Sequence, residues 1–465
     1  MNEFFHLMKT ELIVTIIIFL LLFIKLGKDI KNEQLLPFIQ FVLLVNFIAS
    51  FFYNVDGSLF GDMFYTNSLI AFEKSILSLG VYLISLLSTD WLKKTSHLPE
   101  FFILMLSALL GMCLLLSSGN LLIFYLSLEL ATIPIAAMSN FDLIKKRSSE
   151  AAMKMILSSA FSSGILLFGI SLIYGITGTI VFAELPKLAD GSSLFIMAFV
   201  FLFSSFAFKL SIVPFHLWTA DVYEGSPIAV TSFLSVVSKA AIAFVLLTVL
   251  SGVFQPLQDI WYVLIVVLSV ASMLIGNLFA LRQENIKRFL AFSSIAQVGF
   301  ILVGVSGNSN IGISSVVYFM LIYMVSNLAA FGVASVISEQ TGKENISDYK
   351  GLYKNNPLLG WVLALALFSL AGIPPTAGFF GKLYLLTTGG AKGSYLFISI
   401  AALNMIISLF YYLRVVRAVF IDKNDQPIEK LTIQLPVKLA LFVCSVSIVL
   451  LGIMGWIFDH IESLH

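Results

Sequence analysis

The stretch FAFKLSIVPFHLWTADVYEGSPIAVTSFLSVVSK, from Phe206 to Lys239, decides the fold class of this chain. It is largely apolar, but it also contains Lys209, Pro214 and His216. A charge in the core of a bilayer costs at least about 2.5–3.5 kcal/mol, so a membrane helix that keeps one is expected to use it. Pro214 removes a backbone donor and interrupts a helix, which membranes tolerate only where protein or a water-lined cavity satisfies the backbone. The stretch therefore predicts an ion or proton site near the middle of a membrane.

The composition of the chain agrees with a membrane location. Hydrophobic residues make up 59% of the 465 residues and charged residues only 11%, and the mean hydropathy is +0.99. Because a soluble domain has about 25% charged residues, we expect an all-α polytopic membrane protein. The net charge of +1 argues against a nucleic-acid partner. Cys113 and Cys444 lie in apolar segments without a CxxC motif, so neither a disulfide nor a metal site is expected.

Hydropathy predicts about fourteen transmembrane helices, each near the roughly 20 residues that a bilayer requires. They cover residues 5–26, 35–53, 67–88, 101–118, 120–139, 152–176, 194–219, 227–251, 260–281, 289–306, 312–338, 357–388, 392–420 and 434–457. The seventh contains Pro214, and the twelfth is too long for one span and contains Pro374 and Pro375. We therefore expect both to be broken helices.

Basic residues outside the spans gather in alternate loops. These residues are Lys25, Lys28, Lys31, Lys93, Lys94, Lys145, Lys146, Arg147, Arg282, Lys287, Arg288, Lys343, Lys350, Lys354, Arg414, Arg417, Lys423, Lys430 and Lys438. The opposite loops hold only Lys9, Lys187 and Lys392. Cytoplasmic loops of membrane proteins are rich in lysine and arginine, so both termini are expected on the outer side of the membrane.

The order of the spans also indicates an internal repeat. Spans four to eight and nine to thirteen are two five-helix blocks, each with a proline-broken fourth helix. An odd number of spans inverts the second block relative to the first, which is typical of transporters. We expect four parts: three N-terminal helices in 1–100, a first repeat in 101–251, a second, inverted repeat in 260–420, and a loop with the last helix in 421–465.

The charged residues inside the spans are the candidates for function. The lysines are Lys74, Lys154, Lys209, Lys239 and Lys382, and the deepest acid in the sequence pattern is Glu129. A desolvated lysine loses its proton more readily, whereas a nearby carboxylate favours the charged form. A lysine whose carboxylate partner approaches and retreats is therefore a proton switch.

This chemistry suggests a proton route through the chain. We expect Glu129 and Lys209 to form the switch, with Lys239 as the next station and Lys382 as the station on the exit side. Lys154, close to a loop, suits the uptake side, and His216 could bridge stations through water because the unperturbed pKa of histidine lies near neutrality.

Less specific explanations remain open for these residues. Lys74 could snorkel or pair with the adjacent Glu73, and Lys154 could also snorkel. Three functions fit the pattern: a proton-channel subunit of a redox complex, a subunit of a cation/proton antiporter without redox partners, and a structural subunit whose charges only hold helices together.

Several segments of the chain resemble one known family. They are PFHLWTADVYEGSP at 214–227, VSKAA around Lys239, SLELATIP around Glu129, KKRSSEAAMK ending at Lys154, NIKRFLAFSSIAQVGF at 285–300, SNLAAFGV at 326–333 and AGIPPTAGFFGK ending at Lys382. Together they resemble the antiporter-like subunits N of NADH-quinone oxidoreductase, respiratory complex I, over most of the chain.

The resemblance implies a translocase subunit that pumps protons when partner subunits reduce quinone in a bacterial inner (plasma) membrane. It places the path on Glu129, Lys209, Lys239 and Lys382. It implies no cofactor in this chain: NADH, FMN, iron–sulfur clusters and quinone belong to partners, which include the sister antiporter-like subunits. The chain itself has no glycine-rich dinucleotide loop or cysteine cluster. One departure is Gln297, where the family pattern leads us to expect a histidine, so a relay there would need a water wire.

Overall fold

The computed structural model describes residues 2–27, 30–52, 55–390, 393–424 and 426–465. Within these ranges the chain is almost entirely helical, and twelve helices are long and apolar enough to cross a membrane. The expected all-α polytopic membrane fold is therefore confirmed. Lys28 and Lys392, two of the loop lysines considered above, lie outside the described residues.

The first part of the chain contains three long helices and a hairpin. Its elements are α1 (Asn2–Leu7), α2 (Lys9–Leu26), α3 (Asn32–Ser50), β1 (Gly57–Leu59), β2 (Phe64–Thr66), α4 (Ser68–Leu87) and α5 (Thr89–Lys94). The antiparallel hairpin β1–β2 was not expected, because strands of three residues are too short to leave an alternating pattern in the sequence.

The middle part of the chain contains the first broken helix. Its elements are α6 (Leu98–Leu116), α7 (Leu121–Ser139), α8 (Lys146–Thr177), α9 (Leu185–Leu188), α10 (Ser193–Leu210), α11 (Leu217–Gly225), α12 (Ile228–Phe233), the π-helix η1 (Leu234–Ser238), α13 (Lys239–Thr248), the π-helix η2 (Val249–Val253) and the 3-10 helix η3 (Gln255–Leu257).

The last part contains the second broken helix. Its elements are α14 (Gln258–Ala280), α15 (Ile286–Ser306), α16 (Asn310–Thr341), η4 (Ile346–Tyr349), α17 (Leu352–Asn355), α18 (Pro357–Ala371), α19 (Ala377–Gly390), α20 (Tyr395–Phe420), α21 (Leu435–Ile453) and α22 (Trp456–Glu462).

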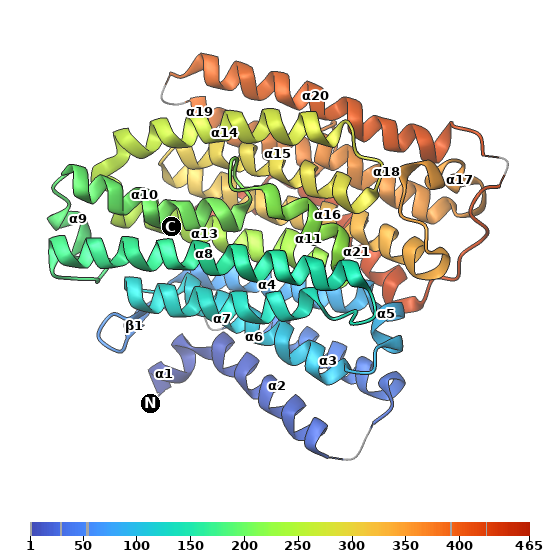
Figure 1. Cartoon of the computed structure of the whole chain (residues 1–465), viewed down its shortest axis with the longest axis horizontal. Coiled ribbons are helices and arrows are strands. Elements are labelled where there is room, and N and C mark those ends of the chain that lie inside the picture. The colour runs from blue at the N-terminus through green and yellow to red at the C-terminus, as the bar shows by residue number, and fades with distance from the viewer. Residues whose placement is uncertain (1, 28–29, 53–54, 391–392, 425) are drawn as a thin grey trace.

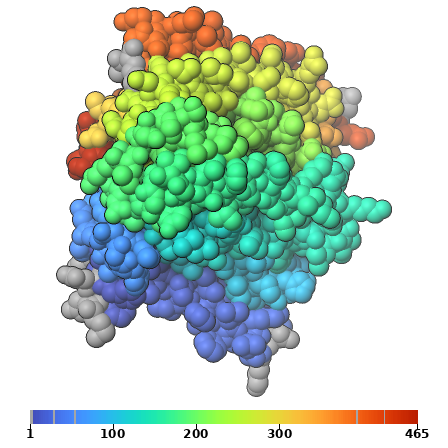
Figure 2. All heavy atoms as spheres, turned by 60° about the vertical axis from the view of Figure 1, so that its left-hand side comes forward, coloured from blue at the N-terminus to red at the C-terminus, as the bar shows by residue number. Residues whose placement is uncertain are grey.

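The long helices lie side by side along the long axis of the molecule (Figure 1). Both termini, β1 and α9 lie toward one end of the bundle, and α5 and α17 lie at the other. We call the second end the basic end, because it carries Lys93 and Lys94 at the end of α5 and Lys145 and Arg147 around the start of α8. Successive parts of the chain form successive bands across the molecule, from the N-terminal helices to α20 (Figure 2).

The two expected helix breaks are present and resemble each other. α10 ends at Leu210, followed by Ser211 in the left-handed region with φ 64°. α18 ends at Ala371, followed by Gly372 with φ 83°. A left-handed residue is a common end of a helix because it turns the chain away from the helix axis. Both breaks also contain a cis peptide bond before a proline, Pro214 in the first and Pro375 in the second.

The most buried helices form the centre of the bundle, whereas Pro214 and Pro375, in the two breaks, are themselves exposed. α15 is buried along its whole length, and α16 and the segment from α12 to η2 are buried almost as completely. In contrast, fewer than half of the residues in the apolar parts of α8, α14, α20 and α21 are buried, as expected for helices that face lipid or other subunits. α11 packs against the central helix α15, and the side chain of Lys239, at the start of α13, also reaches α15 at Ser294.

Candidate functional site

Lys209 lies in the last turn of α10 and is 7% exposed. Its Nζ atom donates a hydrogen bond to Oγ1 of Thr132 on α7, at 2.5 Å. Glu129, half-buried on the same helix, accepts a hydrogen bond from the hydroxyl of Ser163 on α8. No salt bridge between described residues joins Lys209 to Glu129. Because Thr132 and Glu129 are three residues apart, they share a helix face, and Lys209 is held one turn away from its expected partner.

Lys239 begins α13, directly after the π-helical segment η1, and is 1% exposed. Its Nζ atom donates to Oγ of Ser294 on α15 at 2.7 Å. On another side, the ring centroid of Tyr223 on α11 lies 5.8 Å from Nζ. Lys239 is therefore held between α11 and α15. π-helical turns occur frequently at functional sites, which fits the position of η1.

Lys382 on α19 is fully buried. It donates hydrogen bonds to the carbonyl oxygens of Leu370 at 2.7 Å and Ala371 at 3.3 Å, at the end of α18. The ring of Phe300 lies 4.7 Å from Nζ. The last carbonyls of a helix have no partner within the helix and carry partial negative charge, so the second break supplies an acceptor site for an ammonium group.

A chain of polar groups leads from the surroundings of Lys382 toward those of Lys239 and ends at Ser293. Nε2 of Gln297 donates to the carbonyl of Leu370 at 2.9 Å and to the hydroxyl of Tyr412 at 3.0 Å. The Tyr412 hydroxyl also forms a hydrogen bond with Ser293, next to Ser294 in the sequence. Gln297 and Lys382 thus share one carbonyl. Within the described residues, no comparable chain joins Lys209 to Lys239.

The other two candidates lie at the edge of this site. Lys154 on α8 has a 41% exposed side chain and forms ion pairs with Glu150 and with Asp221 on α11, each at 2.6 Å. His216, 8% exposed, lies in the first break, immediately before α11. In the described part of the chain, no hydrogen bond joins His216 to a buried lysine.

Both explanations offered for Lys74 were wrong. Lys74, on α4, neither snorkels nor pairs with the adjacent Glu73: its Nζ lies 2.6 Å from Oε1 of Glu11 on α2, with both side chains at most 3% exposed. Glu129 lies at the middle of α7, but Glu11 and Glu73 are more buried, at 2% and 3% exposed, whereas Glu129 is half-buried. A pattern within one span does not show which face of the helix packs inward.

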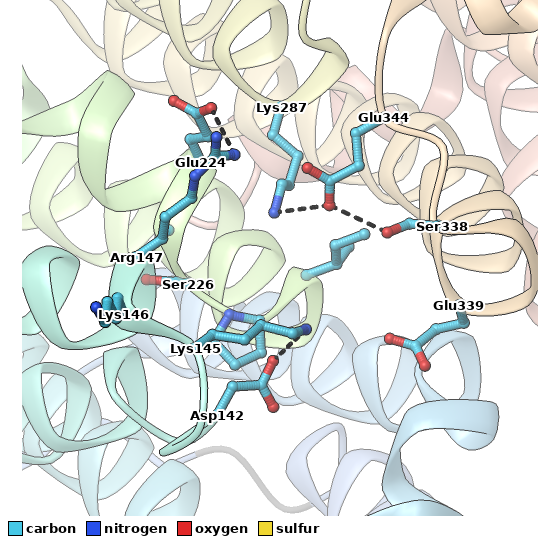
Figure 3. A pocket seen from close by; sticks show the side chains of 14 residues that line it. Asp142, Lys145, Lys146, Arg147, Glu224, Ser226, Lys287, Ser338, Glu339 and Glu344 are labelled. Atoms are coloured by element: carbon cyan, nitrogen blue, oxygen red, sulfur yellow. Dashed lines mark hydrogen bonds and ion pairs between the residues drawn. The ribbon is translucent and has the colours of Figure 1, made fainter.

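A charged cavity of about 550 Å³ opens at the basic end (Figure 3). Lys287 pairs with Glu344 at 3.1 Å, and Lys145 pairs with Asp142 at 2.8 Å. Burial opposes ionisation of Glu344, but the charge of Lys287 and hydrogen bonds from Lys287, Ser338 and Asn285 together lower the pKa of this carboxyl. The cavity therefore presents groups of both signs. No cluster of three or more potential metal ligands occurs among the described residues.

The sequence did not reveal several residues of the site. Thr132, Ser294 and Tyr412 are hydroxyl-bearing residues in apolar helices, and such residues also occur where they only bond their own helix. Their partners lie far away in the sequence. Lys209 is 77 positions from Thr132, Lys239 is 55 positions from Ser294, and Ser293 is 119 positions from Tyr412. The one usable signal was the spacing of three between Glu129 and Thr132.

Comparison with known proteins places the chain in a family. Residues 118–408 match the family described as NADH:quinone oxidoreductase/Mrp antiporter, TM. Subunit N of NADH-quinone oxidoreductase from Phocaeicola vulgatus is 45% identical over 460 residues, which cover 98% of both chains. The subunit N from Azobacteroides pseudotrichonymphae is 41% identical over 441 residues, covering 93% of this chain and 92% of the relative.

Solved structures agree with these relatives. A chain of respiratory complex I from Thermus thermophilus with bound aureothin superimposes with a TM-score of 0.82 at 26% identity, covering 97% of this chain and 98% of the other. A chain of the Mrp complex from Dietzia sp. DQ12-45-1b gives a TM-score of 0.83 at 21% identity, covering 99% and 94%, which is a likeness of fold alone. The resemblance read from the sequence is confirmed: the chain belongs to the NADH:quinone oxidoreductase/Mrp antiporter family of membrane subunits, and within it to the antiporter-like subunits N.

Proposed function

We propose that the chain is a proton-translocating membrane subunit of NADH-quinone oxidoreductase, driven by electron transfer from NADH to quinone in partner subunits. The observation that carries this proposal is the set Lys209, Lys239 and Lys382. Each is at most 7% exposed, and no salt bridge in the described part of the chain pairs any of them with a carboxylate. A desolvated ammonium without a counter-charge exchanges its proton more readily than a paired one.

The proposed route uses Glu129, Lys209, Lys239 and Lys382 as stations. Lys209 switches between Thr132, where it lies in this structure, and Glu129, one turn away on α7. Approach of Glu129 favours the charged lysine, and retreat favours release of the proton. From Lys239 the route continues along the polar chain to Lys382. Lys154 takes part in proton uptake, and His216, in the first break, bridges stations.

Matched features support the two proposed repeats, 101–251 and 260–420. α8 and α16 each have 32 residues, and each is followed by a left-handed glycine, Gly178 with φ 71° and Gly342 with φ 70°. The side chains of Asn120 and Asn285 cap α7 and α15. These pairs stand 164 and 165 positions apart in the sequence.

Close helix contacts follow the same register. A Cβ atom at Gly111 would lie 2.5 Å from the backbone nitrogen of Ala131, and one at Gly276 would lie 2.5 Å from that of Ala296. Both glycines therefore allow two neighbouring helices to approach closely. We propose fourteen spans in all, with 1–100 and 421–465 flanking the repeats.

The orientation follows from charge. The basic end faces the cytoplasm of a bacterium whose inner membrane holds the complex, and both termini lie on the outer side. The partners are the other membrane subunits, including the sister antiporter-like ones. NADH, FMN, iron–sulfur clusters and quinone bind in partners.

A second candidate is a subunit of a multi-subunit cation/proton antiporter, which the family description also covers. The buried lysines would serve this function too. However, fixed ammonium groups along a path repel sodium, which favours protons as the transported species. Sodium-driven transport by membranes that lack the redox subunits would favour the antiporter.

The test uses inside-out membrane vesicles with the whole complex assembled around Lys239→Ala or Lys382→Ala. We expect NADH-driven proton pumping to fall strongly while the amount of complex is unchanged. Lys187→Ala, a change at an exposed lysine of the short helix α9, is the matched control and should pump normally. Normal pumping and quinone reduction in both buried-lysine variants would contradict the proposed function.

A further inference from the structure

Six charged side chains form a connected cluster beside α11. The ionic cluster consists of Arg147, Glu150, Lys154, Asp221, Glu224 and Arg288. It contains three cations and three anions, and it joins α8 to α11 and α11 to α15. Asp221 is shared by Lys154 and Arg288, and Glu224 is shared by Arg147 and Arg288.

Arg288 is the centre of this cluster. Its Nη1 atom lies 2.8 Å from Oδ1 of Asp221 and 2.9 Å from Oε2 of Glu224. The two carboxylates are three residues apart on α11, so they present one face of that helix to the guanidinium. Arg288 belongs to the first turn of α15, and it therefore ties α11 to the central helix.

The same two helices hold Lys239. Tyr223, between the two carboxylates on α11, is fully buried and lies beside the ammonium of Lys239. Ser294, on α15 after Arg288, accepts the hydrogen bond from Lys239. The separation between α11 and α15 thus sets the surroundings of this buried lysine.

α11 depends on such contacts for its position. The break at 211–216 precedes it, and the connection through Ser226 and Pro227 follows it, so neither end continues directly into a helix. Its last residue, Gly225, approaches α8 so closely that a Cβ atom there would lie 2.4 Å from the carbonyl oxygen of Arg147. The charged cavity of Figure 3 lies on one side of this connection, and a smaller cavity of about 190 Å³ is lined by the ionic cluster itself.

We propose that Arg288 is a positioning residue: by clamping Asp221 and Glu224 of α11 to α15, it sets the spacing of Tyr223 and Ser294 around Lys239, and so controls proton transfer at Lys239. This inference rests on the proposed role of Lys239 as a proton station. It adds to that function a structural link between charge at the basic end and the buried path.

The experiment compares Arg288→Gln with Arg288→Lys in vesicles that hold the whole complex. Arg288→Gln removes the ion pairs of a partly exposed arginine, which are worth about 1 kcal/mol or less. We therefore expect the initial rate of NADH-driven proton pumping per assembled complex to fall about two- to fivefold in this variant. Arg288→Lys keeps the charge and should recover most of the rate. Arg282→Gln removes an exposed arginine from the connection just before α15 and is the matched control, with pumping unchanged.

Glu224→Gln is the second variant, since it removes one of the two carboxylates and leaves Asp221 to hold Arg288. We expect a smaller fall than in Arg288→Gln. Wild-type pumping in both Arg288→Gln and Glu224→Gln, or a loss that Arg288→Lys does not reverse, would overturn the clamp. Lys239→Ala, measured in parallel, separates the two proposals: if it pumps normally the station fails, and if it alone loses pumping only the clamp fails.

Discussion

The buried ion pair between Lys74 and Glu11 allows a stability prediction that is independent of proton transfer. Replacing Lys74 with Met leaves the Glu11 carboxylate on α2 without its 2.6 Å partner. Glu73 is a second buried carboxylate, on α4 next to Lys74. Removing one partner of a buried pair costs about 3–5 kcal/mol, which corresponds to about two to three and a half orders of magnitude in an equilibrium constant. We expect α2, which packs on α6 and α3, to detach from the bundle far more readily in Lys74→Met.

The two single variants should differ. Glu11→Gln leaves the ammonium of Lys74 with Glu73 next to it in the sequence, so we expect a smaller loss than in Lys74→Met. The double variant Glu11→Leu with Lys74→Met removes both charges and replaces them with apolar groups. Such replacements are often neutral or stabilising by about 1–4 kcal/mol, so the double variant should recover wild-type stability or exceed it.

The assay is retention of the chain in the purified complex during graded heating in detergent. Lys25→Met is the matched control, because Lys25 also joins α2 to a neighbouring helix, through Glu100 at 2.7 Å, but its side chain is 45% exposed. A surface pair contributes about 0–1 kcal/mol, so little change is expected. A Lys74→Met complex as heat-stable as the wild type, or a double variant as unstable as Lys74→Met, would refute this reasoning.

Three further predictions concern the polar chain and the basic end. Gln297→Leu removes two hydrogen bonds and should slow proton pumping about tenfold, measured in vesicles, and equal rates would exclude Gln297 from the route. Gly225→Ala places a Cβ atom against the carbonyl of Arg147, so the amount of assembled complex on native gels should fall, and unchanged assembly would mean that α11 shifts freely. Because Lys287 lowers the pKa of Glu344, this carboxylate stabilises the α16–η4 connection at pH values above its ordinary pKa, and the stabilisation is lost as the pH falls through the lower folded value. In Lys287→Met that loss should move to higher pH in hydrogen-exchange measurements on residues 342–349, and an unchanged profile would contradict the assignment.

The fold class and both helix breaks could be predicted because their signals are local. An apolar run of about 20 residues specifies a span without reference to the rest of the chain. Likewise, Pro214 and Pro375 interrupt their own helices wherever these pack. The buried positions of Lys209, Lys239 and Lys382 followed from the same local pattern, since each lies within a long apolar segment.

The partners of these lysines could not be predicted because they depend on packing between distant segments. The sequence suggested an ion pair between Lys74 and its neighbour Glu73, whereas in the structure Lys74 forms an ion pair with Glu11, 63 positions earlier. Thr132 and Ser294 accept hydrogen bonds from Lys209 and Lys239 only because α10 packs near α7 and α13 near α15. Hydropathy gives the depth of a residue in its span but not the direction in which its side chain points.

Lys209, the buried lysine just before the first break, is proposed to be a proton station coupled to electron transfer. The measurement that tests it most directly is proton pumping against NADH:quinone activity in membranes that carry Lys209→Ala, with assembly of the complex checked. The account predicts that both activities fall in a fully assembled complex. If both persist at wild-type rates, Lys209 is only a structural partner of Thr132, and the proposed route through the switch with Glu129 is contradicted.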